Sequence, residues 1–268
     1  MTNTMSRRPF LLAPFLLAPV ALHAQERPPI VLVHGAWMGA AAWQRVAALL
    51  RAMGHAVLVP ELPAHGDDQT PASSVSLGVY VRHVLDVIGD RRDIVLVGHS
   101  FGGIVTAAVA EAAPERLRRL VHVAGYLPRD GESAYALSQR DAESLVGRYW
   151  RQDDPQRHSP AFIAADGIVE TFCADCSAAD AAWLVERHRA EPVPPLATPV
   201  ALTASRFGAV PKAYVLTTQD RTISPALQRA MAAAGGVTRM IELPTSHAPM
   251  LSAPEALADA IARLSMQP

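Results

Sequence analysis

The segment Gly98-His99-Ser100-Phe101-Gly102 constrains the fold more than any other part of the sequence, because of what flanks it. Ile94 to Val97, directly before it, is a short apolar run of the kind that forms a buried strand. Gly103 to Ala113, directly after it, has helical composition, and Pro114 follows where that helix would end. A Gly-x-Ser-x-Gly segment between a strand and a helix makes a sharp turn that raises the serine hydroxyl above the carboxyl edge of a sheet. We therefore expect Ser100 to be a nucleophile.

The same order of strand and helix recurs along the chain. Short apolar runs rich in β-branched residues predict further strands at residues 30–33, 55–60, 120–124, 212–217 and 238–242. Helical spacing or composition predicts further helices at residues 40–53, 77–88, 225–234 and 254–265. Strands and helices that alternate in this way form a mostly parallel sheet with helices on both faces. The chain is 50% hydrophobic and 18% charged, which is enough for a sizeable core, so the predicted class is α/β.

One segment interrupts this alternation and divides the predicted core in two. Residues 28–128 form the first part of the core, and residues 200–268 form the second. Residues 129–199 contain no convincing strand and carry Ala, Glu and Arg at helical spacing, which predicts an inserted helical cap. Pro192, Pro194, Pro195 and Pro199 mark the end of the cap, because a helix cannot continue through such closely spaced prolines.

The first 24 residues have the three parts of an export signal in order. Arg7 and Arg8 are basic, Phe10 to Leu22 is apolar, and Ala24 is a small residue that suits cleavage. The segment from Ser6 to Leu12 also resembles the twin-arginine export motif. The alternatives are an uncleaved N-terminal anchor or a chance pair of arginines. We expect an exported protein, periplasmic or secreted, with no membrane span in its mature form, because no later apolar run approaches ~18 residues.

Charge and cysteine content narrow the range of partners. With 24 basic and 25 acidic side chains the formal net charge is −1, so the overall charge does not favour binding of nucleic acid. A homodimer is left open. Cys173 and Cys176 have a C-x-x-C spacing, which is found in redox pairs and in half of a zinc site. Because the pair lies in an Ala-rich region without a second pair of ligands, we expect two buried thiols and no metal site, with a local disulfide as the alternative.

A serine hydroxyl near pH 7 needs a base to take its proton and an acid to orient that base. In the strand–turn–helix context of Ser100, the acid comes after the serine in the chain and the histidine comes last. Asp220 follows the fifth predicted strand, and His247 lies in the loop between the sixth strand and the last helix. Both positions are carboxyl ends of strands and face the turn at Ser100. Asp130, after the fourth strand, is the alternative acid.

The negative oxygen that forms when a hydroxyl attacks an acyl carbon needs backbone N–H donors. Phe101, the residue after the serine, is expected to supply one of them. The loop after the first predicted strand, His34 to Gly39, is expected to bend over the site and to supply the other from Ala36. The side chain of His34 itself is expected to be structural.

Five segments together resemble one branch of the α/β-hydrolase superfamily, the plant methylesterases and hydroxynitrile lyases with their bacterial esterase relatives. The segments are Val31-Leu32-Val33-His34-Gly35-Ala36-Trp37, Gly54-His55-Ala56-Val57, Leu96-Val97-Gly98-His99-Ser100, Ser205-Arg206-Phe207-Gly208-Ala209-Val210 and His247-Ala248-Pro249-Met250-Leu251. The Arg-Phe-Gly stretch and the Met-Leu pair after the histidine are the more specific ones. The resemblance implies an α/β-hydrolase fold with an inserted helical cap.

The resemblance also implies a carboxylesterase-type serine hydrolase that acts on small esters through an acyl-enzyme and needs no cofactor or metal. It implies that Gly35, Ala36 and Tyr126 line the acyl pocket, with the cap aromatics Trp150, Phe172 and Trp183 as further candidates. Hydroxynitrile lyases of this branch carry a lysine after the histidine and a threonine in the first-strand loop. This chain has Ala248 and Gly35 there, which argues against lyase activity. A ligand-binding protein with vestigial turnover on the same fold is the remaining alternative.

Overall fold

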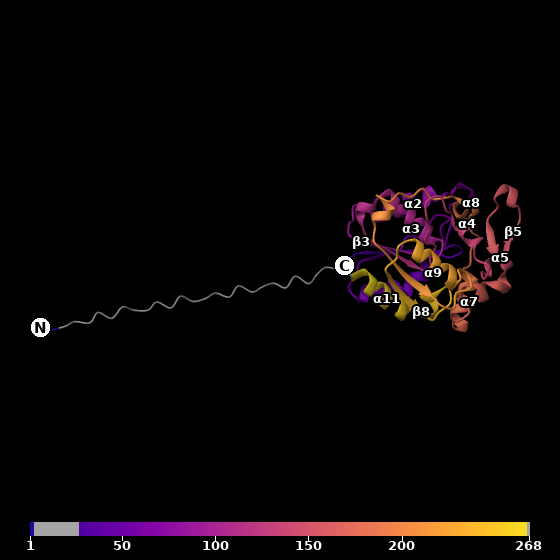
Figure 1. Cartoon of the computed structure of the whole chain (residues 1–268). Coiled ribbons are helices and arrows are strands. Elements are labelled where there is room, and N and C mark those ends of the chain that lie inside the picture. Colours follow the sequence, from indigo (N-terminus) through magenta and orange to yellow (C-terminus); the bar gives the residue numbers. More distant parts are fainter. Residues whose placement is uncertain (3–26, 267–268) are drawn as a thin grey trace.

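A parallel sheet forms the centre of the protein in the computed structural model, which describes residues 1–2 and 27–266 (Figure 1). Among these residues the sheet has six strands in the order β2-β1-β3-β4-β7-β8, and every neighbouring pair is parallel. The strands are β1 (Ile30–Val33), β2 (Val57–Leu58), β3 (Ile94–His99), β4 (Leu117–Val123), β7 (Lys212–Thr217) and β8 (Arg239–Leu243). The expected α/β class with a mostly parallel sheet is confirmed. The expected export signal falls almost entirely on residues 3–26, outside the described residues.

Helices cover both faces of the sheet. They are α1 (Gln44–Ala52), α2 (Leu77–Ile88), α3 (Gly102–Ala112), α9 (Pro225–Ala234), the short α10 (Pro249–Ser252) and α11 (Pro254–Met266). Crossovers between parallel strands are right-handed, so the direction of each step along the sheet decides the face of its helix. The step from β1 to β2 runs opposite to the steps that contain α2, α3 and α9, which places α1 on the other face from these three helices. α11 packs beside α1.

The strand order reverses between β1 and β3, and this reversal positions the site. The chain leaves β1 toward one edge of the sheet and leaves β3 toward the other, so the loops at the carboxyl ends of these two strands diverge. Val33 at the end of β1 is paired with Gly98 near the end of β3. The turn after β1 and the turn that carries Ser100 therefore begin side by side.

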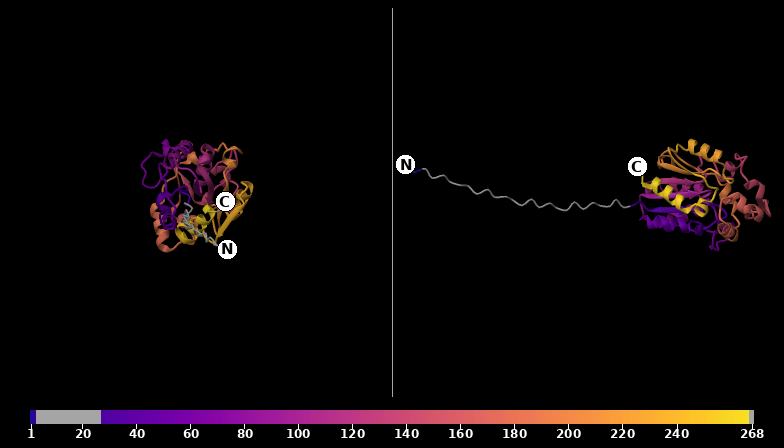
Figure 2. Two further views of the ribbon diagram at one scale, coloured as in Figure 1. Left: turned by 90° about the vertical axis from the view of Figure 1, so that its left-hand side faces the viewer. Right: turned by 90° about the horizontal axis from the view of Figure 1, so that it is seen from below.

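The cap between β4 and β7 gathers at one end of the molecule, in pink and orange (Figures 1 and 2). Its helices are α4 (Ala134–Ser138), α5 (Val146–Tyr149), α6 (Ile168–Phe172), α7 (Ala178–Arg187) and α8 (Val193–Ala197). The expectation that this segment has no strand is wrong, because β5 (Trp150–Gln152) and β6 (Ala161–Ile163) form an antiparallel pair. Each strand has only three residues, which is too short to show a period of two in the sequence.

The observed elements differ from the predicted ones mainly at their ends. The helix expected at residues 40–53 is a 3₁₀ turn over Ala40–Trp43 followed by α1. The strand expected at residues 55–60 is reduced to the two residues of β2, which lies at the edge of the sheet and has Pro60 just beyond it. In the described part of the chain, no helix combines the length and the apolar character that a bilayer crossing requires.

Candidate active site

Ser100 lies in the turn between β3 and α3, with a positive φ of 54°. This left-handed backbone is costly for a residue with a side chain and persists where the surroundings hold it. The carbonyl oxygen of Ser100 accepts hydrogen bonds from the N–H groups of Gly103 and Tyr126, both at 3.0 Å. A Cβ atom at position 98 would lie 2.6 Å from both the Gly102 carbonyl oxygen and Thr106 Oγ1, so the turn requires glycine there. The expected sharp turn at Ser100 is present.

The backbone amides expected to form the oxyanion hole lie beside this serine. Ala36, in the turn after β1, and Phe101 both line the cavity into which Ser100 opens. Among the described residues, neither amide N–H donates a hydrogen bond to a protein acceptor. α3 begins at Gly102, so the positive end of its dipole points at the same place. The arrangement is suited to stabilising a negatively charged oxygen.

Asp220 and His247 form a buried pair at the carboxyl ends of β7 and β8. Nδ1 of His247 lies 2.8 Å from Oδ2 of Asp220, and the side chains are 1% and 0% exposed. Because the carboxylate can only accept, Nδ1 carries the proton, and Nε2 is the ring nitrogen that remains free to act as a base. Asp130, the alternative acid, instead accepts a hydrogen bond from the backbone N–H of Leu202 at 2.9 Å. The structure therefore brings Asp220 to His247 and leaves Asp130 elsewhere.

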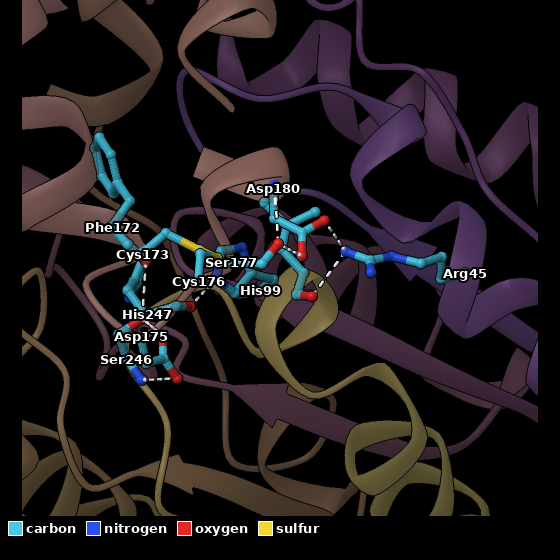
Figure 3. The surroundings of a disulfide bond; sticks show 11 residues. Arg45, His99, Phe172, Cys173, Asp175, Cys176, Ser177, Asp180, Ser246 and His247 are labelled. Carbon is cyan, nitrogen blue, oxygen red and sulfur yellow. Dashed lines mark hydrogen bonds and ion pairs between the residues drawn. A yellow bond between two sulfur atoms is a disulfide. The ribbon is translucent and has the colours of Figure 1, made fainter. Parts of the chain in front are cut away.

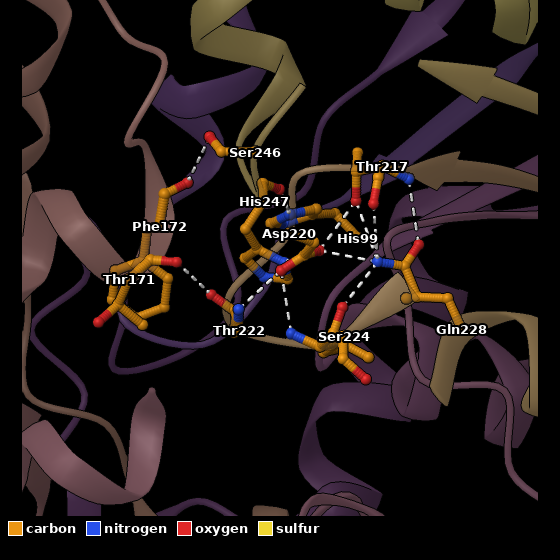
Figure 4. A network of polar contacts seen from close by, with 12 residues as sticks. His99, Thr171, Phe172, Thr217, Asp220, Thr222, Ser224, Gln228, Ser246 and His247 are labelled. Atoms are coloured by element: carbon orange, nitrogen blue, oxygen red, sulfur yellow. Dashed lines mark hydrogen bonds and ion pairs between the residues drawn. The ribbon is translucent and has the colours of Figure 1, made fainter. Parts of the chain in front are cut away.

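A network of donors holds the Asp220 carboxylate in place (Figure 4). Oδ2 accepts from Thr217 Oγ1 and from Gln228 Nε2, both at 2.9 Å. Oδ1 accepts from the backbone N–H groups of Thr222 at 2.7 Å and Ile223 at 2.9 Å. Gln228 lies on α9 and is fully buried. The sequence analysis did not identify it, because only the packing of α9 against β7 brings it to the acid.

His99, the residue before Ser100, is hydrogen-bonded to the backbone of His247. Its Nε2 lies 2.8 Å from the backbone carbonyl oxygen of His247, and the two rings are 4.6 Å apart. Burial, with a smaller effect from the nearby His247, holds the pKa of His99 well below its ordinary value. His99 is therefore a neutral ring that donates from Nε2. Its position inside the Gly-x-Ser-x-Gly segment was a signal that the sequence analysis did not use.

The cap holds the residue before His247 (Figure 3). Asp175 accepts hydrogen bonds from both the hydroxyl and the backbone N–H of Ser246. Cys173 and Cys176 are joined in a disulfide that closes the loop around Asp175. The expectation of two free thiols is therefore wrong, and the alternative of a local disulfide is the observed state. Sequence spacing could not distinguish the two, because the turn between α6 and α7 is what brings the sulfur atoms together.

A narrow apolar cavity of about 40 Å³ opens onto Ser100. Of the predicted residues, Ala36, Phe101, Tyr126 and Trp150 line it. The sequence analysis missed other lining residues, which come from the turn after β1, the cap and the loop after β7: Trp37, Ala134, Tyr135, Ser138, Val146, Leu196 and Thr222. Burial raises the pKa of Tyr126, so this phenol stays protonated. The cavity therefore offers a charge-free, mainly hydrocarbon wall to a bound molecule.

Three predicted pocket residues lie outside this wall. A Cβ atom at Gly35 would lie 2.7 Å from the Cβ of Ser100, so the glycine permits close packing of the turn against the serine. The ring of Phe172 is buried and packs 6.0 Å from the ring of His247. Trp183, on α7, lines a separate cavity with Met38. The expectation that Trp183 lines the pocket at Ser100 is wrong, because α7 places it in this second cavity, which Gly39 and Glu61 also line.

Comparisons with known proteins identify the family and the fold. A family model described as alpha/beta hydrolase family matches residues 30–260. Methylesterase 2 of Arabidopsis thaliana is 26% identical over 249 residues, which is 88% of this chain and 95% of the relative. A pyrethroid hydrolase of Sphingobium wenxiniae is 28% identical over 247 residues, 89% of this chain and 88% of the relative. The crystal structure of polyneuridine aldehyde esterase shares the fold, with a TM-score of 0.80 at 21% identity over 89% of this chain and 99% of that one.

Proposed function

The chain belongs to the alpha/beta hydrolase family and is a carboxylesterase-type enzyme, and from this premise we propose that it hydrolyses small carboxylic esters through Ser100, His247 and Asp220. The observation that carries the proposal is the buried His247–Asp220 pair at 2.8 Å, on the same edge of the sheet as the strained turn of Ser100. The apolar cavity that opens onto Ser100 would hold the ester.

The first half of the reaction transfers the acyl group to the enzyme. Ser100 Oγ attacks the ester carbonyl carbon while His247 Nε2 takes the hydroxyl proton. The carbonyl oxygen becomes negative and accepts hydrogen bonds from the amides of Ala36 and Phe101. Asp220 stabilises the imidazolium through Nδ1–H. The C–O bond to the alcohol then breaks, and the alcohol leaves with the proton that His247 returns to it.

The second half releases the acid by the same steps. His247 Nε2 takes a proton from water, whose oxygen attacks the acyl carbon on Ser100. The amides of Ala36 and Phe101 again hold the negative oxygen. Collapse of this intermediate breaks the bond to Ser100 Oγ, which recovers the proton from His247, and the carboxylic acid departs.

The cavity favours a small, uncharged ester. Its volume of about 40 Å³ accommodates a short acyl group, and its lining contains no arginine or lysine that could pair with a charged acid. Trp150 and Tyr135, both from the cap, also line the cavity, and we expect these rings to limit the length of the acyl chain that fits. We expect kcat/KM to fall as the acyl chain grows beyond a few carbons.

Release of p-nitrophenol from its acetate, butyrate and octanoate esters tests the proposal. We expect many turnovers per enzyme molecule and loss of turnover in Ser100→Ala. Ser265→Ala is a matched control, because this buried serine on α11 donates its hydroxyl proton to the carbonyl of Ile261, one turn earlier in the same helix, at 2.7 Å. A burst of at most one equivalent without further release would indicate a ligand-binding protein, and activity in Ser100→Ala above about a hundredth of wild type would reject the assignment of the nucleophile.

We also propose that the protein is exported, to the periplasm or the medium. The export-signal pattern of residues 1–24 motivates this, and the Cys173–Cys176 disulfide suits an oxidising compartment. Cell fractionation of the natural host, with thiol titration of the denatured mature protein, tests it. We expect export of a chain that begins near residue 25 and exposes thiols only after reduction. A cytosolic chain that retains its N-terminus would contradict the proposal.

A further inference from the structure

A buried carboxylate from the cap contacts the turn after β1. Glu191 lies between α7 and α8, 154 residues from Trp37 in sequence, and its side chain is 0% exposed. Its Oε2 accepts a hydrogen bond from the backbone N–H of Trp37 at 2.9 Å. Burial of a carboxylate is costly unless partners compensate it. A buried carboxylate at this position therefore needs a positively charged or hydrogen-bonding partner.

His65 compensates the charge of Glu191. Its Nε2 lies 2.8 Å from Glu191 Oε2, and its Nδ1 lies 3.1 Å from the carbonyl oxygen of Pro63. Both partners are acceptors, so both ring nitrogens carry protons and the ring is positive. Burial opposes this charge, but Glu191, together with the Pro63 carbonyl and Glu61, outweighs it, so the pKa of His65 is raised. The result is an ion pair, fully shielded from water, between the loop after β2 and the cap.

Other polar groups around this pair do not replace either partner. The ring of His34 is 5.0 Å from that of His65, and its Nε2 accepts a hydrogen bond from the backbone N–H of Leu62 at 3.1 Å, with Glu61 Oε1 3.3 Å away. The ring of Tyr80, on α2, packs 5.6 Å from His65. His188 stacks on the indole of Trp37, and burial lowers its pKa to about 4, so it is neutral.

The turn that Glu191 contacts has a strained backbone. Trp37 has a φ of +60°, a conformation that costs about 1–3 kcal/mol for a residue with a side chain and persists when the surroundings impose it. The cap supplies those surroundings: besides Glu191, the N–H of Arg189 donates to the Trp37 carbonyl at 3.1 Å, and the Trp37 indole donates to the Ala161 carbonyl at 3.1 Å. The polar groups of Trp37 are thus held by residues of the cap.

We propose that Glu191 is a positioning residue for the oxyanion hole: its carboxylate fixes the Ala36–Trp37 peptide and so aims the Ala36 amide at the oxygen that becomes negative. The inference rests on the proposed esterase function. Ala36 precedes Trp37, so rotation of the peptide that Glu191 holds would turn the neighbouring Ala36 amide away from Ser100. The oxyanion hole is therefore complete only when Glu191 of the cap is hydrogen-bonded to the turn after β1.

Two substitutions at position 191 separate positioning from bulk stability. Glu191→Ala removes the acceptor of the Trp37 N–H, and we expect kcat to fall by about 10- to 100-fold with little change in KM, because displacement of a catalytic donor by about 1 Å has an effect of this size. Glu191→Gln can place an amide oxygen at the position of Oε2, where it still accepts from the Trp37 N–H and from Nε2–H of His65, so it should retain most of the wild-type kcat.

Glu132→Ala is the matched control. Glu132 is also a buried cap carboxylate, but it pairs with two exposed arginines, Arg129 and Arg140. We expect this variant to lose thermal stability and to keep its kcat. Hydrogen exchange of the Trp37 amide, measured on the same proteins, should accelerate in Glu191→Ala only.

The outcomes distinguish this inference from the proposed function. An active wild type whose kcat and Trp37 amide exchange are unchanged in Glu191→Ala would overturn the inference alone. Equal losses of kcat in Glu191→Ala and Glu191→Gln would also overturn it, because the acceptor would then not be the cause. A wild type without ester turnover would reject the proposed function itself.

Discussion

His99 donates a hydrogen bond from Nε2 to the backbone carbonyl oxygen of His247 at 2.8 Å. This bond joins the turn that carries Ser100 to the loop that carries the proposed base, so the distance between nucleophile and base does not depend on side-chain packing alone. Nδ1 of His99 is buried without a hydrogen-bond partner in the described part of the chain, consistent with a neutral ring that has its proton on Nε2.

We predict that His99→Phe lowers kcat by about tenfold with little effect on KM. The phenyl ring fills the space but leaves the buried carbonyl of His247 unpaired, at a cost of about 1–3 kcal/mol, part of which falls on the transition state. His99→Asn keeps an N–H donor and should lose less. Steady-state kinetics on a p-nitrophenyl ester measure both, and an equal loss in the two variants would mean that ring volume, not the hydrogen bond, matters.

Asp220→Asn should lower kcat by several orders of magnitude, about 10⁴-fold in the serine-protease precedent. The backbone N–H groups of Thr222 and Ile223 keep the amide oxygen at the position of Oδ1, so the N–H₂ group faces Nδ1 of His247. The ring then carries its proton on Nε2, which is no longer available as a base. Asp130→Asn is the matched control, since the carboxylate of Asp130 accepts a hydrogen bond from the backbone N–H of Leu202 and not from His247. Loss of activity in Asp130→Asn with a normal Asp220→Asn would show that the acid is assigned to the wrong residue.

Buried histidines should make the fold sensitive to acid. Burial lowers the pKa of His122, on β4, to about 3, well below its ordinary value of 6.5. Between these values the unfolded chain binds a proton that the folded protein does not, so stability is present above pH 6.5 and is lost as pH falls toward 3. From pH 7 to pH 5 this one residue should lower the free energy of unfolding by about 2 kcal/mol.

Urea unfolding at pH 7 and pH 5 measures that loss. In His122→Asn it should shrink by about 2 kcal/mol, because the titrating group is gone. His158→Asn, a substitution of an exposed histidine in the cap, should keep the wild-type difference between the two pH values. If His122→Asn shows the same pH dependence as wild type, another buried group is responsible.

The enzyme should not release cyanide from mandelonitrile above the buffer rate. The residue after His247 is Ala248, which is 0% exposed, so the loop of the proposed base presents no cation there to a departing anion. In an apolar cavity an unpaired cyanide ion is strongly disfavoured. A cyanide-selective electrode measures the rate, and enzyme-dependent release that disappears in Ser100→Ala would establish lyase activity.

Local patterns predicted the framework of the site. The apolar runs before Ser100, Asp220 and His247 are strands because β-branched residues fit a sheet covered on both faces, and parallel strands bring their carboxyl ends to one edge. The position of each residue just after its strand therefore predicted that the three would gather there. The Gly-x-Ser-x-Gly segment predicted a sharp turn at Ser100, and the structure shows the contacts that a side chain at Gly98, two residues earlier, would violate.

Contacts between distant segments decided the rest. The sequence by itself determined the α/β alternation, the turn at Ser100 and the order of Ser100, Asp220 and His247, because each depends on residues within one strand, turn or helix. Only the tertiary structure showed that Glu191 pairs with His65 and that Gln228 donates to Asp220. It also showed that Cys173 and Cys176 form a disulfide, and that Trp37, not Trp183, lines the cavity at Ser100. These arrangements depend on how the cap and the helices pack on the sheet, and that packing is set by shape and by hydrogen-bond satisfaction across long sequence separations, which local periodicity does not record.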